Sequence, residues 1–459
     1  MANSFPPGPY KTVQIGEAGE LAPWYIIPFD KNGTITAPLT RNHLIESIKG
    51  KTYTDVFLFS HGWNNDWAAA SERYEDFIGG FLRMRAQYGL KPPTSYAPLL
   101  IGVFWPSTAL VMPWERPPKF AAAAMGTDDN AAGAWQREIE ELALEIDKAD
   151  REEFYALAQK PSLNAVQAER LAEIIASVSK RFDHADVEVA STDESPSAKE
   201  LVNRAKRVAG PARKAGNVGD FGFATNSSAR PEAAFGLGDL DPRNLVRIAT
   251  VLQMKDRAAR VGAQGVGPLL RDVLAADTKL RVHLVGHSYG AIVMLSAVCY
   301  PKNKPLSPQL ESILLLQPAV SRWCFAKDVD NQGFAGGYRP ALESVRSPLF
   351  TTFTKHDVPL TKLFHLAVRR DTDLGQVQIA AGGLPEAPST YAALGGFGPA
   401  GMSKDELQVL DLAPPVTRLP LRTPLPKICA LNGDAVITGH GDVSIPATWW
   451  ALFQQIESA

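Results

Sequence analysis

Short runs of apolar residues recur along the chain, separated by longer segments in which apolar positions follow a helical spacing. Apolar runs of this length, bounded by polar residues, are typical of strands that are covered on both faces of a sheet. They lie at residues 55–60, 99–105, 282–285, 313–316, 349–353 and 428–431. Helices are predicted at residues 39–49, 68–87, 244–275, 291–298 and 449–456. This alternation predicts an α/β fold with a mostly parallel central sheet flanked by helices.

Two parts of the chain depart from this alternation. The pair Asn32-Gly33 favours a tight turn between extended stretches, so we expect a hairpin over about residues 24–38. The connection from Trp105 to Val282 is much longer than the dozen or more residues that a crossover needs. Its middle part is rich in Ala, Glu, Lys and Leu, which predicts helices over residues 131–159 and 161–181.

We therefore divide the chain into three segments. Residues 1–114 are the first part of an α/β core, residues 115–240 a large helical insertion, and residues 241–459 the second part of the core. The insertion is interpreted either as a lid or cap over a functional site or as a peripheral addition without functional contact, because long connections carry only a modest functional signal.

The composition narrows the functional classes. Of the 459 residues, 45% are hydrophobic and 21% charged, as expected for a globular protein with a large core. The net charge of −2 and the lack of a basic stripe with interleaved aromatics speak against nucleic acid as a partner. No apolar run approaches the roughly 18 residues that span a bilayer, and no secretory signal is visible, so we expect a cytoplasmic protein without a transmembrane segment. Histidines and cysteines never cluster at ligand spacing, so we predict no metal and no other cofactor.

A Gly-x-Ser-x-Gly pattern at residues 286–290 (GHSYG) directly follows one of the apolar runs. The pattern alone is weak, but here a strand leads in and a helix leads out, which is the setting of a nucleophilic serine. Such a turn strains the serine backbone, so its neighbours must lack bulk, as Gly286 and Gly290 do. We therefore predict that Ser288 is a nucleophile; the alternative is a serine that merely caps the following helix.

Acyl transfer also needs N–H groups that stabilise an oxyanion. One donor is expected from the residue after the nucleophile, and another from the loop after an earlier strand. The predicted donors are Tyr289 and Trp63, and the residues predicted to bind substrate are His61, Gly62, Asn64 and His287. We expect His61 to orient its loop by hydrogen bonding rather than to transfer protons. The alternative for this loop is a plain turn.

An acid and a base are expected downstream of the serine, in the order serine, acid, histidine. His440 follows the last apolar run and precedes the final helix, which favours it as the base over His356 and His365. Asp357 follows the run at 349–353, where a carboxylate can accept the ring N–H of His440 and stabilise the imidazolium. Asp328, Asp330 and Asp442 stay open as alternative acids.

These motifs resemble those of the α/β-hydrolase superfamily, most closely its poorly characterised bacterial esterase-like and lipase-like members. The similarity covers about residues 20–110 and 240–456 and rests on the stretches HGWN at 61–64, WPS at 105–107 and GHSYG at 286–290. It implies the α/β-hydrolase fold and a triad of Ser288, Asp357 and His440. The insertion departs from the pattern, because many members carry a lid after the strand that follows the nucleophile, whereas here the insertion precedes it.

The expected activity is hydrolysis of a small carboxylic ester with an apolar acyl or alcohol part, through an acyl-enzyme. A thioesterase, an acyltransferase or a peptidase would use the same residues, and a lipase acting at an interface is one form of the main hypothesis. The alternative from another class is a non-catalytic interaction protein that binds partners through the insertion. The sequence carries no indication of the oligomeric state.

Overall fold

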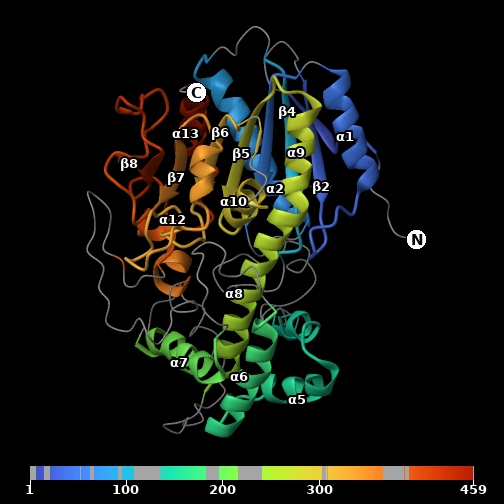
Figure 1. Cartoon of the computed structure of the whole chain (residues 1–459), viewed down its shortest axis with the longest axis vertical. Coiled ribbons are helices and arrows are strands. Elements are labelled where there is room, and N and C mark those ends of the chain that lie inside the picture. The colour runs from blue at the N-terminus through green and yellow to red at the C-terminus, as the bar shows by residue number, and fades with distance from the viewer. Residues whose placement is uncertain are drawn as a thin grey trace.

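A nine-stranded sheet forms the centre of the molecule, in the order β1-β2-β4-β3-β5-β6-β7-β9-β8 (Figure 1). This computed structural model describes residues 7–14, 21–51, 53–62, 67–90, 96–107, 135–136, 138–181, 196–214, 240–301, 306–307, 309–364, 387 and 392–457. Every neighbouring pair is parallel except β1 with β2. The predicted α/β class with a mostly parallel central sheet is therefore confirmed.

The strands are β1 (Lys11–Gln14), β2 (Leu21–Pro28), β3 (Asp55–Ser60), β4 (Pro98–Phe104), β5 (Arg281–His287), β6 (Ser312–Leu316), β7 (Leu349–Phe353), β8 (Leu407–Asp411) and β9 (Ile428–Asn432). The helices around the sheet are α1 (Pro38–Gly50), α2 (Trp67–Gln87), α8 (Pro242–Arg260), α9 (Gly267–Ala276), α10 (Gly290–Cys299), α12 (Leu394–Phe397) and α13 (Pro446–Glu457).

Successive residues of the central strands enter two separate hydrophobic clusters. In β3, Val56 and Leu58 lie in one cluster, whereas Phe57 and Phe59 lie in the other. Helices α1, α8, α9 and α10 contribute to the first cluster, and helices α2 and α13 to the second. Because both faces of the sheet are covered, consecutive residues in the middle of the central strands are apolar, as at residues 56–59 of β3, which explains the unbroken runs in the sequence.

The expected hairpin over residues 24–38 is wrong in its strand pairing. β2 pairs antiparallel with β1, which precedes it, and residues after the turn contribute only a single bridge between Phe29 and Ile35. The turn itself is present, with Gly33 at φ 84° and the side chain of Asp30 accepting the backbone N–H groups of Asn32 and Thr34. The turn residues therefore predicted the reversal but not the partner strand.

One continuous helical run joins the insertion to the core. The helix expected at 244–275 is present as α8, a π-helical segment η1 (Val261–Val266) and α9. Asp241 begins the run by accepting the N–H of Arg243, and Pro242 occupies the first turn. A methyl group added to Gly262 would lie 2.8 Å from the Cβ of Ser296, so η1 packs tightly against α10.

The insertion consists of helices that lie apart from the sheet in Figure 1. They are α5 (Lys148–Ala158), α6 (Ala165–Ser179) and α7 (Ala198–Lys214), and residues 138–143 are also helical. The helix predicted over 131–159 is thus divided, whereas α6 matches its prediction and begins at a capping box of Asn164 and Gln167. Helices α6 and α7 both contact α8. The predicted boundary after residue 240 therefore falls just before a helix that the insertion and the core share.

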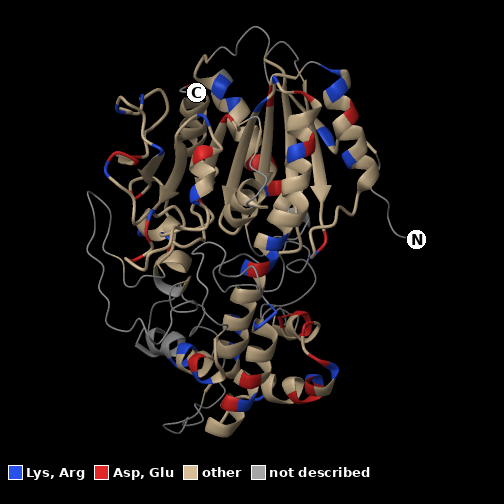
Figure 2. Cartoon of the chain, viewed as in Figure 1, with Lys and Arg blue, Asp and Glu red and all other residues tan. Residues whose placement is uncertain are grey.

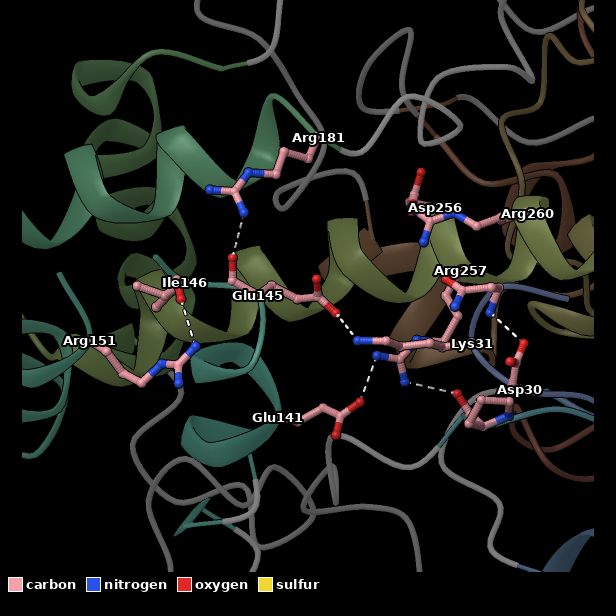
Figure 3. Close-up of polar contacts among 12 residues, drawn as sticks. Asp30, Lys31, Glu141, Glu145, Ile146, Arg151, Arg181, Asp256, Arg257 and Arg260 are labelled. Atoms are coloured by element: carbon pink, nitrogen blue, oxygen red, sulfur yellow. Dashed lines mark hydrogen bonds and ion pairs between the residues drawn. The ribbon is translucent and has the colours of Figure 1, made fainter. Parts of the chain in front are cut away.

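Two ion pairs fasten the insertion to the ends of two strands of the core (Figure 3). Lys31, in the turn after β2, lies 2.8 Å from the carboxylate of Glu145. Arg257 of α8 binds the carboxylate of Glu141 at 2.6 Å and donates to the carbonyl oxygen of Pro106, just after β4, at 3.1 Å. The Arg257 side chain is only 4% exposed, so solvent screens this contact little.

Charged residues of both signs are interspersed along the helices of core and insertion (Figure 2). One buried polar cluster lies at the amino-terminal ends of three central strands. There the ring of His283 lies 3.0 Å from the carboxylate of Asp55 and 2.7 Å from the hydroxyl of Ser312, and all three side chains are fully buried. Burial raises the pKa of Asp55, but hydrogen bonds from His283 and Thr54 outweigh this, so the net pKa lies below the usual value.

Within the part of the chain that the structure describes, no helix is both long and apolar enough to cross a membrane.

Replacing Arg257 tests how much its buried contacts between the insertion and the core contribute to the stability of the protein. We expect Arg257→Met to lower the free energy of unfolding by about 2 kcal/mol, because the Glu141 carboxylate and the Pro106 carbonyl lose a charged donor. Arg170 is the matched control, since it binds Asp150 and Glu153 on the surface of the insertion and is 39% exposed. Arg170→Met should cost less than about 1 kcal/mol in urea unfolding. Equal losses of unfolding free energy in the two variants would contradict a larger contribution from the buried Arg257 contacts.

Candidate active site

Ser288 lies between the end of β5 and the start of α10, in a backbone conformation that residues other than glycine rarely adopt. Its φ is 55°, in the left-handed region, which costs on the order of 1 kcal/mol for a residue other than glycine. Main-chain hydrogen bonds hold it there: its N–H donates to the oxygen of Leu316 at 3.0 Å, and its oxygen accepts the N–H of Ala319 at 3.2 Å. The strand–turn–helix setting predicted for this serine is therefore present.

Three glycines make the turn possible. A methyl group on Gly286 would lie 2.8 Å from the Cα of Ala291, so the strand and the helix could not approach each other as they do. On Gly290 it would collide with the backbone of Ser60 and His61, at the end of the neighbouring strand β3. On Gly62 it would lie 2.7 Å from the Cβ of Ser288. The loop after β3 thus passes directly beside the serine.

Ser288, His440 and Asp357 form a continuous chain of hydrogen bonds. The Oγ of Ser288 lies 2.8 Å from Nε2 of His440, and Nδ1 of His440 lies 2.7 Å from Oδ2 of Asp357. Asp357 follows β7, and His440 follows β9, which is paired in parallel with β7. The three residues therefore meet beyond the carboxyl ends of parallel strands, where sheets of this kind place their ligands.

The carboxylate of Asp357 is fully buried and accepts three hydrogen bonds. Its Oδ1 accepts the backbone N–H of Leu360 at 3.0 Å. Its Oδ2, which faces His440, also accepts Nε2–H of Gln317 at 3.0 Å. An ionised carboxylate in this setting can fix the tautomer of His440 and stabilise its protonated form.

The alternative acids and bases lie elsewhere. Asp442 accepts the backbone N–H and the hydroxyl of Thr438, and Asp328 accepts the backbone N–H of Gly333. Neither these two nor Asp330 takes part in the hydrogen-bond chain of Ser288. The side chain of His356 is exposed, and His365 lies outside the described residues.

His61 is held inside the protein by contacts on both ring nitrogens. Its Nδ1–H donates to the oxygen of Gly62 at 2.8 Å, its Nε2 accepts the backbone N–H of Trp105 at 3.3 Å, and its ring stacks on the Trp105 indole. Burial lowers the pKa of His61 to about 3, although the Gly62 contact opposes the shift. His61 is therefore a neutral residue that fixes the loop after β3, and the substrate contact predicted for it stays a prediction.

His287 is likewise buried beneath the site. Its Nε2–H donates to the backbone oxygen of His440 at 2.9 Å and so holds the loop that carries the proposed base. Burial, followed by the nearby positive charges of His440 and Arg73, lowers the pKa of His287 well below its usual range. The substrate contact predicted for His287 stays a prediction beside this hydrogen bond to the backbone of His440.

The predicted oxyanion donors are described only in part. Tyr289 immediately precedes α10, at a helix amino terminus where backbone N–H groups and the helix dipole favour negative charge. Trp63 and Asn64 lie outside the described residues. The close approach of Gly62 to Ser288 nevertheless brings the start of their loop to the serine.

Sequence reasoning missed the residues that support the chain of hydrogen bonds. Gln317 directly follows an apolar run, and no pattern in the sequence distinguishes it from any polar residue at a strand end. The backbone contacts of Leu316 and Ala319 with Ser288 have no sequence signal at all, because they depend on how β6 lies beside β5.

The chain was compared with known proteins. No family model, no curated protein and no solved structure matches it. The interpretation of the site therefore depends on its geometry. Among the described residues, no group of three or more His, Cys, Asp or Glu side chains is arranged to hold a metal ion.

Because His61 has a lowered pKa in the folded protein, it should make folding less favourable in acid. Below about pH 6.5 the unfolded chain binds a proton at this residue that the folded protein does not bind until about pH 3. Between pH 7 and pH 5, the wild type should therefore lose about 2 kcal/mol more of its unfolding free energy than His61→Gln does. Urea unfolding at both pH values measures this difference. His356→Gln, at an exposed histidine, is the control and should follow the wild-type curve; parallel curves for all three proteins would contradict the assignment.

Proposed function

We propose that this protein is a serine hydrolase of the α/β-hydrolase type that cleaves carboxylic esters through an acyl-enzyme. The observation that carries the proposal is the chain of hydrogen bonds from Ser288 through His440 to Asp357, with distances of 2.8 Å and 2.7 Å. The strained serine, the strand–turn–helix setting and the order serine, acid, histidine along the chain support the same proposal.

In the proposed reaction, Ser288 attacks the ester carbonyl while His440 removes the hydroxyl proton through Nε2. The tetrahedral intermediate carries a negative oxygen, for which the N–H of Tyr289 and that of Trp63 are the proposed donors. His440 then protonates the leaving alcohol. Water, deprotonated by the same histidine, attacks the acyl-enzyme and releases the acid. Asp357 remains ionised and stabilises the imidazolium in both half-reactions.

The proposed substrate is a small carboxylic ester with an apolar acyl or alcohol part. An ester demands less of this machinery than an amide, because an alcohol leaves more easily than an amine. Thioesters and acyl transfer to another alcohol would use the same three residues, and a lipase would act on esters at an interface. A scaffold without activity would have no use for a strained serine joined to a histidine and a buried carboxylate.

Covalent labelling of Ser288 tests the proposal. A fluorophosphonate should label the wild type at Ser288, and Ser288→Ala should lose both labelling and p-nitrophenyl ester turnover, with kcat at least about 1,000-fold lower. Ser312→Ala is the matched control, because Ser312 also lies beside a histidine and an aspartate but is fully buried. It should keep the label and the turnover. Absence of wild-type labelling, with folding verified by circular dichroism, would refute the serine hydrolase.

The class of bond is tested with matched substrates. An oxygen ester, a thioester and an anilide of the same acyl group should differ in kcat/KM, and we expect the oxygen ester to exceed the anilide by at least about 1,000-fold because of its better leaving group. Oxygen esters with acyl groups of about two to twelve carbons then test, by their kcat/KM, whether the site prefers an apolar acyl group. A thioester that exceeds the oxygen ester tenfold would reassign the protein as a thioesterase. Fast turnover of acetate and butyrate esters alone would remove the lipase hypothesis.

A further inference from the structure

A short segment after β6 contacts both the nucleophile and the acid of the proposed site. Residues 316–319 bind the backbone of Ser288 on two sides, through the oxygen of Leu316 and the N–H of Ala319. The same segment carries Gln317, whose side-chain amide reaches the carboxylate of Asp357. Four consecutive residues thus link the acid to the nucleophile.

Gln317 holds an unfavourable backbone conformation at this point. Its φ is 43°, in the left-handed region, and its backbone N–H donates to the hydroxyl of Thr352 at 2.9 Å. The side chain is fully buried. A methyl group on Gly395 would lie 2.5 Å from the backbone carbon of Gln317, so α12 packs directly against this strained residue. Strain of this kind persists only where the surroundings enforce it, and it concentrates at functional sites.

The orientation of the Gln317 amide follows from its neighbours. Nε2 lies 3.0 Å from Oδ2 of Asp357 and 3.3 Å from the backbone oxygen of Gly395, and both of these atoms only accept hydrogen bonds. The reverse orientation would direct Oε1 at two acceptors. In the orientation present, Oε1 is buried and has no hydrogen-bond partner among the described residues. Leaving a buried acceptor unpaired is costly, so the two contacts of Nε2 must offset that cost.

We propose that Gln317 is a positioning residue of the site, which holds the Asp357 carboxylate in place and shares with His440 the oxygen that both bind. This inference rests on the proposed function, since it assigns Asp357 as the acid. Oδ2 accepts two donors, from His440 and Gln317, while Oδ1 accepts the backbone N–H of Leu360. The carboxylate therefore cannot rotate without breaking a contact. The amide also draws part of the negative charge of Oδ2 away from His440.

Two measurable consequences follow for a variant without the amide. In Gln317→Met, a side chain of similar length fills the space but donates nothing to Oδ2. The charge on Oδ2 then acts on His440 without competition from the amide, and the imidazolium is favoured. His287, whose ring lies 5.1 Å from that of His440, and Arg73, beside Gly441, are the same in both proteins. We expect the acid limb of the kcat/KM profile to move up by about half a pH unit. We also expect kcat to fall about tenfold with KM within twofold, because the carboxylate is less well oriented.

Gln455 provides a matched control for the cost of removing a buried amide. Its Nε2 also donates to two acceptors, the backbone oxygens of Ile313 and Pro348, and its Oε1 is also buried without a partner among the described residues. It lies on α13 and has no contact with the triad in these bonds. Gln455→Met should destabilise the protein to a similar degree but leave the pH profile in place. An unmoved or lowered acid limb in Gln317→Met, or the same change in both variants, would overturn the proposal.

A direct titration of His440 separates this inference from the proposed function. The ring of His440, isotopically labelled and followed by NMR, should take up its proton at higher pH in Gln317→Met than in the wild type, whether or not either protein turns over an ester. Gln317→Leu, which likewise donates nothing to Oδ2, is the second variant if the first does not fold, and it should move the titration in the same direction. A titration that moves in a protein without esterase activity would refute the proposed function alone. An unchanged titration in an active wild type and its variant would refute the role of Gln317 alone.

Discussion

The positive φ of Ser288 is the constraint to which the surrounding structure is fitted. A residue that turns this sharply from strand to helix leaves no room for side chains beside it, which is why Gly286 and Gly290 flank the turn. It also requires external support, because an L-residue does not hold this conformation by itself. The support comes from the next strand, through the backbone of Leu316 and Ala319. The geometry of the serine is thus a property of two neighbouring strands and of the glycine loop at Gly62, rather than of the five-residue motif.

The molecule contains a serine, a histidine and an aspartate in hydrogen-bonded sequence at both ends of its sheet. At the amino-terminal end, Ser312, His283 and Asp55 are fully buried, and stacking of His283 on Phe57 closes the cluster. At the carboxyl end, the His440 side chain is 13% exposed. The two clusters have the same residue types and similar distances, so these do not distinguish a reactive site from a structural one. Backbone strain at the serine, a helix amino terminus beside it and some access to solvent do distinguish them, and only the carboxyl end combines all three among the residues described.

The sequence predicted what depends on local pattern and chain order. Apolar runs such as residues 56–59 predicted the central strands. Chain order and the position after an apolar run favoured Asp357 and His440, while the other acids stayed open. The edge strands β1 and β8 escaped prediction because their residues are half-exposed and form no apolar run. Gln317 escaped for a different reason. Its role depends on a contact with Asp357, which lies 40 positions further along the sequence. A local sequence pattern carries no signal for a contact between residues that far apart.

The insertion was expected to be either a lid or cap or a peripheral addition, and the path of the chain now adds a third possibility. A lid moves by a hinge, and hinges are formed by loops or by the ends of helices. One side of the insertion instead enters the core as α8, which continues without a break through η1 into α9. The π-helical segment η1 packs against α10, the helix that begins just after Ser288. In α8, Arg257 donates a hydrogen bond to the backbone oxygen of Pro106, just after β4. Movement of the insertion as a rigid body would therefore have to bend a buried helix or displace the serine helix with it. On this side the insertion is mechanically part of the site, so substitutions within it should be interpreted for their effect on the serine as well as on any substrate that it covers.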